Sequence, residues 1–383
     1  MNPGHTELRK RTSSDGRRSG EIDAFIPARL AEQRVASGDP IAEAAAERAL
    51  RSLRGEHVLQ PLASSLLRSE GIASSRIEGE VASTRRVFEA DYAADAVSDH
   101  PAQRIVNSIR VMRDVIATNA DGVSPDTFDR WHERLFEGDA VAFQPGIVKD
   151  RQNWIGARSD TPVGAEFVAA PPDVVAEAVA DLAVFVNRVD VSPVTQAAVA
   201  HAHFETIHPY PDGNGRIGRA LVYRSWAFRG LIGPVTPPIS RVLLESRSLY
   251  IDGLTAYRAG DVDAWLRYFF DVVESAVSYT HSLGARLEDL IVAWQGRLEG
   301  AHEDALVRRL AADLPLHPIT SATDVARRYD VTERGALLAL DDLAGRGIVT
   351  HRPMRKARRG RPAKVYEATE LFALLDLSPR DLA

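Results

Sequence analysis

Apolar residues recur every three or four positions over most of the chain, which is the spacing that gives an α-helix one buried face. The predicted helices cover residues 41–53, 59–67, 102–117, 125–136, 174–186, 194–207, 217–228, 243–259 and 262–292. A further short helix fits between Gly71 and Gly79 and carries Ser74 and Glu78 one turn apart on one face. The pattern therefore predicts a mainly α protein.

One stretch in the middle of the chain departs from the helical pattern. Residues 146–167 set Gly, Pro, Asp and Ser among β-forming residues such as Ile147 and Ile155. Pro171 and Pro172 close the stretch before the next helix. We therefore expect a β-hairpin here, between two helices.

The C-terminal part of the chain has a different pattern, from about residue 315 onwards. Residues 321–329, 332–346, 347–350 and 364–366 predict the order helix, turn, helix, strand, strand, with Thr332 as N-cap of the second helix. This order resembles a winged helix-turn-helix domain.

A basic run lies in and between the two C-terminal strands, without one acidic residue. Its members are Arg352, Arg355, Lys356, Arg358, Arg359, Arg361 and Lys364. Such a run can neutralise the phosphates of a DNA duplex. It is equally compatible with a solvated, flexible hairpin or with a protein-docking module.

Composition narrows the class of protein only slightly. The chain has 383 residues, 45% of them hydrophobic, and a net charge of −6. This length exceeds that of a usual single core, so two or three domains are expected, and the net charge gives no global reason to expect nucleic acid binding. Cysteine is absent, which excludes disulfides, thiolate nucleophiles and cysteine-ligated zinc.

The domain organisation follows from these patterns. Residues 1–21 are expected to form a disordered basic tail, because Arg and Lys stand there among Ser and Gly without an apolar stretch. Three folded regions follow: an N-terminal helical region at residues 22–95, a helical core at 96–285 and the winged helix-turn-helix domain at 286–383. No apolar run approaches the roughly 20 residues that span a bilayer, so we expect a cytoplasmic protein without a membrane partner.

Twelve residues that lead from the end of one predicted helix into the start of the next concentrate the polar chemistry of the chain, from His208 to Arg219. Their sequence is HPYPDGNGRIGR, and residues 211–215 are too rich in Pro and Gly to be helical. A glycine-rich turn that opens a helix directs backbone N–H groups at an anion, and the helix dipole adds positive charge there. Arg216 and Arg219 add forked donors suited to phosphate oxygens.

Two more side chains of this loop suit phosphate chemistry. A histidine side chain has an unperturbed pKa near neutrality, so His208 can accept a proton from an attacking hydroxyl. Asp212 offers a hard oxygen ligand for a Mg²⁺ ion that bridges phosphate oxygens. The loop thus combines a base, a metal ligand and an anion-binding turn.

The twelve residues resemble the signature of the Fic family, HPFxDGNGRxxR, and depart from it at one fixed position, where Tyr210 replaces Phe. Residues 74–79, SSRIEG, are similar to the family's inhibitory-helix motif [S/T]xxxE[G/N], whose residues here are Ser74, Glu78 and Gly79. The hairpin is similar to the flap that docks the target segment, through Trp154, Ile155 and Gly156.

The resemblance, over roughly residues 25–285, implies an all-helical Fic core with a short β-hairpin flap and the activity of a protein adenylyltransferase. Such an enzyme transfers AMP from ATP to a Ser, Thr or Tyr hydroxyl of a protein and releases pyrophosphate. It implies His208 as catalytic base and Asp212 as Mg²⁺ ligand. The implied nucleotide-binding residues are Asp212, Gly213, Asn214, Gly215, Arg216, Ile217, Gly218, Arg219 and Tyr250. For Tyr250, placed near the adenine by the resemblance, a core tyrosine is equally compatible.

The inhibitory motif implies regulation of this site. If Glu78 forms a salt bridge with Arg219, the arginine cannot hold the γ-phosphate, and the enzyme is autoinhibited. Alternatives remain open: removal of AMP from a modified protein, transfer of another phosphate-linked group such as UMP or phosphate, and a DNA-binding regulator that senses nucleotide without turnover. Self-modification and a homodimer also remain open.

Overall fold

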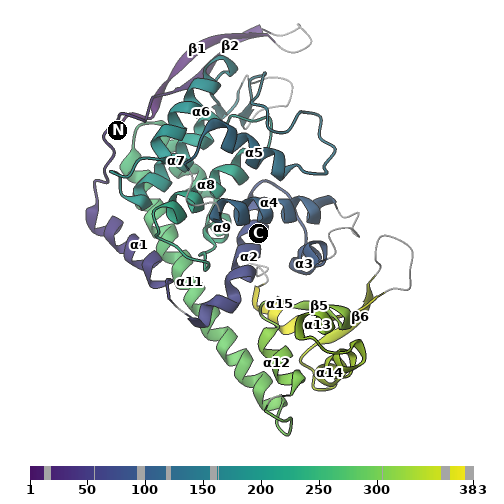
Figure 1. Ribbon diagram of the computed structural model, residues 1–383. Helices are drawn as coiled ribbons and strands as arrows, with labels where there is room; N and C mark the ends of the chain where they lie inside the picture. The colour runs from purple at the N-terminus through teal and green to yellow at the C-terminus, as the bar shows by residue number, and fades with distance from the viewer. Residues whose placement is uncertain are drawn as a thin grey trace. The chain divides into compact units, whose positions relative to one another are not determined.

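The computed structural model of the chain describes residues 1–12, 19–55, 57–92, 100–117, 122–155, 162, 164–303, 305–354 and 363–375. Most of these residues are helical, as predicted (Figure 1). The chain forms two compact units: residues 1–52, 110–233 and 242–275 make the first, and residues 53–109, 234–241 and 276–383 make the second. The domain boundaries drawn from the sequence stay a prediction.

The first unit contains two β-hairpins and most of the predicted helices. Its elements are β1 (Gly4–Thr12), β2 (Ser19–Pro27), α1 (Pro40–Ser52), α5 (Pro125–Leu135), β3 (Trp154–Ile155), β4 (Phe167–Val168), α6 (Pro172–Val186), α7 (Pro193–Ile207), α8 (Asn214–Phe228) and α10 (Arg247–Arg258). Three helices have residues in both units: α4 (His100–Ala117), α9 (Ile239–Glu245) and α11 (Val262–Arg297). The helices predicted at 102–117, 125–136, 174–186, 194–207, 217–228 and 262–292 are thus confirmed as α4, α5, α6, α7, α8 and α11.

Helices α7 and α8 form the centre of the first unit. Every residue of α7 is buried, and α8 is buried from Asn214 to Ala227. The two helices approach closely at Gly218, where a Cβ atom would lie 2.7 Å from Oε1 of Glu205 and 3.2 Å from Cδ1 of Phe204. Because a larger residue has no room there, Gly218 sets how near the two helices of the site lie.

The N-terminal residues correct the prediction of a disordered tail that leads into a helix. Strand β1 pairs antiparallel with β2, with Gly4 opposite Pro27 and Arg9 opposite Ile22. The reason lies in β2, where exposed Glu21 and Asp23 alternate with buried Ile22 and Ala24. Ile22 and Ala24 pack on Val168 of β4, with Trp154 against the same cluster. The apolar face of this hairpin therefore has a partner that local sequence does not reveal.

Two predicted helices have different limits in the structure. Helix α2 (Ala63–Ile77) passes through Gly71, which was expected to precede a separate short helix. A Cβ atom at Gly71 would lie 2.4 Å from Cγ1 of Ile109, so this glycine serves close packing and does not end a helix. A 3₁₀ turn (His57–Leu62) precedes α2. The helix predicted at 243–259 is interrupted at Ser246, between α9 and α10.

The second unit also holds α3 (Thr84–Tyr92) and the C-terminal elements. These are α12 (Leu306–Asp313), β5 (Ile319–Ser321), α13 (Ala322–Tyr329), α14 (Glu333–Gly345), β6 (Thr350–Met354), β7 (Ala363–Glu367) and α15 (Thr369–Leu375). The strands form one antiparallel sheet in the order β5-β7-β6. The predicted order is confirmed, and the Thr332 hydroxyl accepts a hydrogen bond from the Gly335 N–H at 3.1 Å, as an N-cap does. Strand β5 was missed because three residues carry no periodicity.

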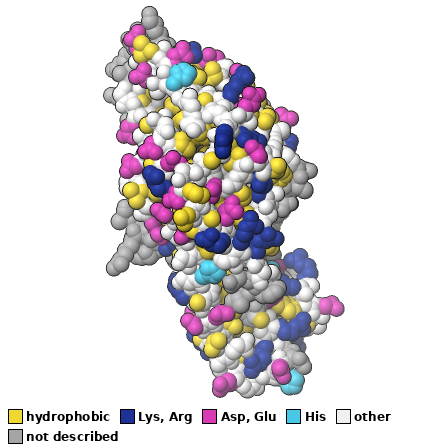
Figure 2. Space-filling view, turned by 90° about the vertical axis from the view of Figure 1, so that its left-hand side faces the viewer, with side chains coloured by type: hydrophobic (Ala, Val, Ile, Leu, Met, Phe, Trp, Pro, Cys, Tyr) yellow, Lys and Arg dark blue, Asp and Glu magenta, His cyan; other side chains and the backbone are white. Residues whose placement is uncertain are grey.

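Charges are mixed on the surface. On the face shown in Figure 2, basic and acidic side chains lie among one another, which agrees with a net charge of only −6. Within the described part of the chain, no helix has both the length and the apolar character that crossing a membrane requires.

Candidate active site

The site is built where α7 ends and α8 begins. The backbone leaves α7 at His208, whose φ of 51° and ψ of 61° are left-handed, while its N–H still donates to the Phe204 carbonyl at 2.8 Å. In the described residues, only Asp330 shares a positive φ among residues other than glycine. A left-handed residue with a Cβ costs about 1 kcal/mol or more, so the surrounding structure must hold His208 in place.

The imidazole of His208 has a defined tautomer. Its Nδ1 lies 3.3 Å from the backbone oxygen of Glu205, which can only accept a hydrogen bond, so Nδ1 carries the hydrogen. The lone pair then lies on Nε2, as a general base requires. The Glu205 carboxylate lies 3.9 Å from Nδ1 and is 10% exposed, so it favours the imidazolium that forms when Nε2 takes up a proton.

The glycine-rich turn leads into α8, which includes Asn214 and Gly215, two residues that the sequence predicts to be non-helical. Gly213 is the N-cap of α8 with a left-handed φ of 78°, and its N–H donates to Oδ1 of Asp212 at 2.6 Å. The Asp212 side chain is 54% exposed, and Nη2 of buried Arg216 lies 3.5 Å from it. Arg219 is also buried. Two guanidinium groups shielded from water near a helix N-terminus provide a strong field for phosphate oxygens.

The side chain of Asn214 is hydrogen-bonded to the backbone of the loop. Its Oδ1 accepts from the N–H of Tyr210 at 2.8 Å, and its Nδ2 donates to the Tyr210 carbonyl at 2.8 Å. Asn214 therefore joins the start of α8 to the Tyr210 backbone through both groups of its amide. Its part in phosphate binding stays a prediction.

Sequence reasoning missed His132 of α5, which holds the loop from the side. Its Nδ1 accepts from the N–H of Gly146 at 2.8 Å, its Nε2 donates to the Asp212 carbonyl at 3.1 Å, and its ring stacks on Tyr210 with centroids 4.1 Å apart. Burial lowers the pKa of His132 to about 4, so the ring is neutral near pH 7, as both hydrogen bonds require. No motif marks His132, because its partners lie 14 and 80 residues away.

Tyr250 occupies a buried position on α10. It is 2% exposed, and its hydroxyl lies 3.0 Å from Nε2 of His201 on α7. These are the surroundings of a core tyrosine, one of the two interpretations open from the sequence. A contact with adenine stays a prediction.

The predicted flap is a short hairpin. Trp154 pairs with Val168 and Ile155 with Phe167, while Gly156 lies outside the described residues. Ile155 is 47% exposed, so the hairpin presents an apolar side chain to solvent. Docking of a target on it stays a prediction.

The inhibitory motif lies at the end of α2, in the second unit. Ser74 is buried within the helix, Glu78 is its exposed C-cap, and Gly79 follows with a left-handed φ of 87°. The Glu78 N–H donates to the Ser75 carbonyl at 3.1 Å. The pairing of Glu78 with Arg219 joins residues of different units and stays a prediction.

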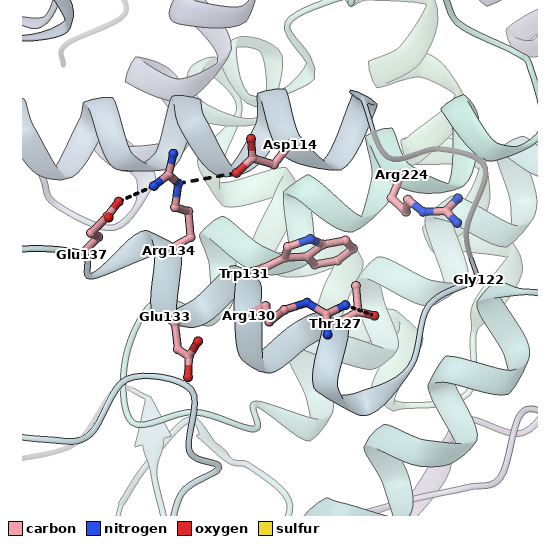
Figure 3. Close-up of a pocket in the computed structure, with 9 residues that line it drawn as sticks. All are labelled: Asp114, Gly122, Thr127, Arg130, Trp131, Glu133, Arg134, Glu137 and Arg224. Carbon is pink, nitrogen blue, oxygen red and sulfur yellow. Dashed lines mark hydrogen bonds and ion pairs between the residues drawn. The ribbon is translucent and has the colours of Figure 1, made fainter.

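Two pockets of the first unit lie around these elements. One, of about 550 Å³, is lined by residues 142–144 and 147–153 together with Pro211 of the loop. The other, of about 640 Å³, is lined by α5 residues and by Asp114 and Arg224, and contains none of the predicted site residues (Figure 3). There Arg134 bridges Asp114 and Glu137, so opposite charges compensate each other within it.

The loop offers one carboxylate, that of Asp212, to a magnesium ion. The described residues contain no cluster of three His, Cys, Asp or Glu side chains able to hold a metal. Mg²⁺ is usually held by one or two carboxylates together with substrate phosphates and water. The half-exposed carboxylate of Asp212, beside the anion-binding turn, suits that arrangement.

Comparisons with known proteins agree with the resemblance of the loop to the Fic signature. Residues 122–224 match the model of the Fic/DOC family. The chain is similar to the protein adenylyltransferase fic-1 of Caenorhabditis elegans, with 25% identity over 211 residues, or 52% of this chain and 38% of the relative. It is also similar to the protein adenylyltransferase Fic of Drosophila willistoni, with 25% identity over 297 residues, or 72% of this chain and 52% of the relative. The chain thus spans about half or less of the length of these two relatives.

Solved structures show the same fold. A Fic family protein from Desulfovibrio desulfuricans superposes with a TM-score of 0.51 at 17% identity, over 88% of this chain and 97% of that one. Fic-1 of C. elegans superposes with a TM-score of 0.52 at 20% identity, over 66% of this chain and 73% of that one.

Proposed function

The chain carries a Fic domain at residues 122–224, and on this premise we propose that it is a protein adenylyltransferase. It transfers AMP from ATP to a Ser, Thr or Tyr hydroxyl of a protein target and releases pyrophosphate. The observation that carries the proposal is the 3.3 Å contact of His208 Nδ1 with the Glu205 carbonyl, which assigns the basic nitrogen to Nε2, beside a turn that leads to buried Arg216 and Arg219.

Each step of the proposed AMP transfer can be assigned to a group of the loop or of a helix next to it. The target hydroxyl oxygen forms a bond to the α-phosphorus, the bond from that phosphorus to the bridging oxygen breaks, and pyrophosphate leaves. The hydroxyl proton passes to Nε2 of His208, and the Glu205 carboxylate stabilises the resulting imidazolium. Arg216, Arg219 and the N–H groups at the start of α8 bind the phosphates. When bound through Asp212, Mg²⁺ neutralises phosphate charge and favours departure of pyrophosphate.

A protein target binds as an extended segment along the flap. The edge of a two-stranded hairpin offers main-chain hydrogen bonds that ask little of the target sequence. Exposed Ile155 supports an apolar contact there. Self-modification follows the same geometry when the segment belongs to another copy of the chain, as in a homodimer.

Autoinhibition by Glu78 completes the proposal. Glu78 takes the guanidinium of Arg219 in the resting enzyme and displaces the γ-phosphate. This part rests on the SSRIEG motif at the C-terminal end of α2.

Transfer of labelled AMP tests the proposed function. Cell lysate is incubated with α-labelled ATP, Mg²⁺ and one of three chains, the wild type, Glu78→Gly or His208→Ala, and labelled proteins are identified. We expect strong label with Glu78→Gly, weaker label with the autoinhibited wild type and none with His208→Ala. Label transferred from γ-labelled ATP would indicate transfer of phosphate, and label transferred from UTP in preference to ATP would indicate transfer of UMP. Loss of label from an AMPylated protein would indicate the reverse reaction.

The alternative of a DNA-binding regulator depends on the C-terminal elements, whose assignment to the winged helix-turn-helix class is part of this proposal. The exposed face of α14 carries Glu333, Arg334, Leu337, Leu338, Asp341 and Asp342. Asp341 and Asp342 are paired with Lys364 and Arg346, so this face carries no excess of positive charge that would attract a duplex. Two of the basic residues are also engaged: Arg352 bonds Glu367 at 2.6 Å, and Lys364 bonds Asp341 at 2.6 Å. These contacts favour a protein partner; residues 355–361 lie outside the described residues.

A further inference from the structure

We propose that Lys149 and Asn153 are positioning residues of the transfer site, which clamp the backbone of the loop and thereby fix His208 in line with the flap. The inference rests on the proposed adenylyl transfer and adds to it two residues of the segment that leads into β3. Neither residue belongs to the motif of the loop.

The clamp consists of hydrogen bonds to consecutive carbonyl groups. Nζ of Lys149 donates to the Ile207 carbonyl at 3.2 Å, and the backbone N–H of Lys149 donates to the Pro209 carbonyl at 2.8 Å. Nδ2 of Asn153 donates to the carbonyls of His208, at 3.3 Å, and of Tyr210, at 3.0 Å. Four successive carbonyls of the loop thus accept from two residues.

The clamp acts where the backbone is strained. His208 is left-handed, and such a conformation persists only where neighbouring contacts over-determine it. The bonds on either side of His208 and on its own carbonyl leave its φ and ψ little freedom. The direction of the imidazole, and so the position of Nε2, follows from these angles.

Lys149 is suited to the end of a helix. Its Nζ meets the last carbonyl of α7, where the helix dipole favours a cation. The residue is 4% exposed, and burial lowers its pKa to about 7. Burying a lysine costs free energy unless its ammonium group is hydrogen-bonded. Nζ of Lys149 donates to the Ile207 carbonyl and to Oδ1 of Asn153. Lys149 therefore also orients the Asn153 amide, whose Nδ2 must face the loop.

Asn153 connects the base to the docking surface. It directly precedes Trp154 of β3, and its own carbonyl accepts from the Ala169 N–H at 3.3 Å, just beyond β4. A target strand that pairs with the flap is thus positioned relative to Asn153, which also bonds the His208 carbonyl. This relation gives the clamp a role in aligning the hydroxyl with Nε2, where a misplacement of 1 Å can cost about 100-fold in rate.

The test compares variants of the clamp with a matched control. Asn153→Ala and Lys149→Met remove donors, and Lys149→Arg keeps a cation of similar length. Arg229→Met is the control, because Arg229 likewise donates to three carbonyls, those of Arg188, Val189 and Val191, in the turn between α6 and α7. For each chain we measure kcat and KM for ATP in AMP transfer, and hydrogen exchange of residues 205–213.

We expect Asn153→Ala to lower kcat about 10- to 100-fold with KM for ATP within about threefold, because the base moves while the phosphate turn stays. Lys149→Met is expected to lower kcat about tenfold and Lys149→Arg to restore most of it. Hydrogen exchange of residues 205–213 is expected to become faster in Asn153→Ala and Lys149→Met, and to stay unchanged in Lys149→Arg and Arg229→Met.

Three outcomes overturn the inference: unchanged kcat in both donor-deleting variants, an equal fall of kcat in Arg229→Met, or unchanged exchange of residues 205–213. If Asn153→Ala fails to fold, the pair Lys149→Met and Lys149→Arg decides alone. Absence of AMP transfer by both the wild type and Glu78→Gly would instead reject the proposed function, and the exchange measurement still tests the clamp.

Discussion

The phenol of Tyr210 donates a hydrogen bond to Oδ1 of Asp129 on α5 at 2.7 Å. Tyr210 stands where the Fic signature has Phe, and it is fully buried. A buried hydroxyl needs a partner, and α5 supplies one with a half-buried carboxylate. The departure from the signature is therefore compensated 81 residues away in the chain.

A double-mutant cycle measures this compensation. Asp129→Ala leaves the buried hydroxyl without its acceptor and is expected to lower the free energy of unfolding by about 1–3 kcal/mol. Tyr210→Phe in the Asp129→Ala background should then cost less than in the wild type, because the hydroxyl is no longer bonded. Urea unfolding of the four chains gives the coupling; strictly additive effects contradict it.

Acid is expected to destabilise the first unit through His132. Its folded pKa of about 4 lies below the ordinary 6.5, so the unfolded chain binds the proton first. This stabilisation is complete above pH 6.5, falls as the pH drops from 6.5 to about 4, and does not fall further below 4. Between pH 7 and 5 the loss is about 2 kcal/mol.

Unfolding of the wild type and of His132→Asn at both pH values measures this contribution. Between pH 7 and 5, His132→Asn should lose about 2 kcal/mol less of its free energy of unfolding than the wild type does. His203, whose pKa burial lowers to about 3, acts in the same direction in both chains and cancels in the comparison. An equal acid sensitivity of the two chains excludes His132 as its source.

Gly213 is expected to tolerate no side chain. Its φ of 78° is left-handed, and a Cβ atom would lie 2.7 Å from Leu135 Cδ2 and 3.0 Å from Phe136 Cε2. Gly213→Ala should cost about 2–3 kcal/mol of stability and weaken ATP binding, since the turn moves. Gly138→Ala is the control, because Gly138 has a φ of 74° with nothing within 4 Å. Calorimetric titration with ATP and thermal unfolding check both; equal effects in the two variants refute a steric cause.

Glu78→Gly is expected to raise AMP transfer. A regulatory coupling of about 1–3 kcal/mol corresponds to roughly a 5- to 150-fold higher rate. Glu80→Gly is the matched control, because Glu80 bonds Arg104 at 2.6 Å and belongs to no part of the motif. Initial rates with α-labelled ATP compare the three chains. A Glu78→Gly chain no faster than wild type removes the autoinhibition.

Duplex DNA is expected to bind the chain no more tightly than non-specific contacts do, with a Kd of roughly 10⁻⁶–10⁻⁴ M. The reason is the exposed face of α14, which carries no excess of positive charge. Fluorescence anisotropy with a labelled duplex, at two salt concentrations, measures it. Nanomolar binding that weakens steeply with salt and vanishes when Arg355, Arg358, Arg359 and Arg361 are neutralised establishes the regulator instead.

Local sequence anticipated those parts of the fold that rest on local physics. Helices α4 to α8 follow from apolar spacing, although α8 begins at Asn214, three residues before the predicted start at residue 217. Strand β2 was missed although Ile22 and Ala24 alternate with acids, because its partner face on β4 lies far away in the chain. Gly71 was taken for a helix end, since the nearness of Ile109 is not visible in one segment.

The sequence by itself determined the chemical groups of the site, because His208, Asp212, Arg216 and Arg219 lie within twelve residues and a turn between two helices brings them together. The tertiary structure alone decided how these groups are held. His132, Lys149 and Asn153 bond loop carbonyls over separations of 55 to 80 residues. Backbone carbonyls are alike at every position, so no pattern of side chains along the chain can show which donor will reach them.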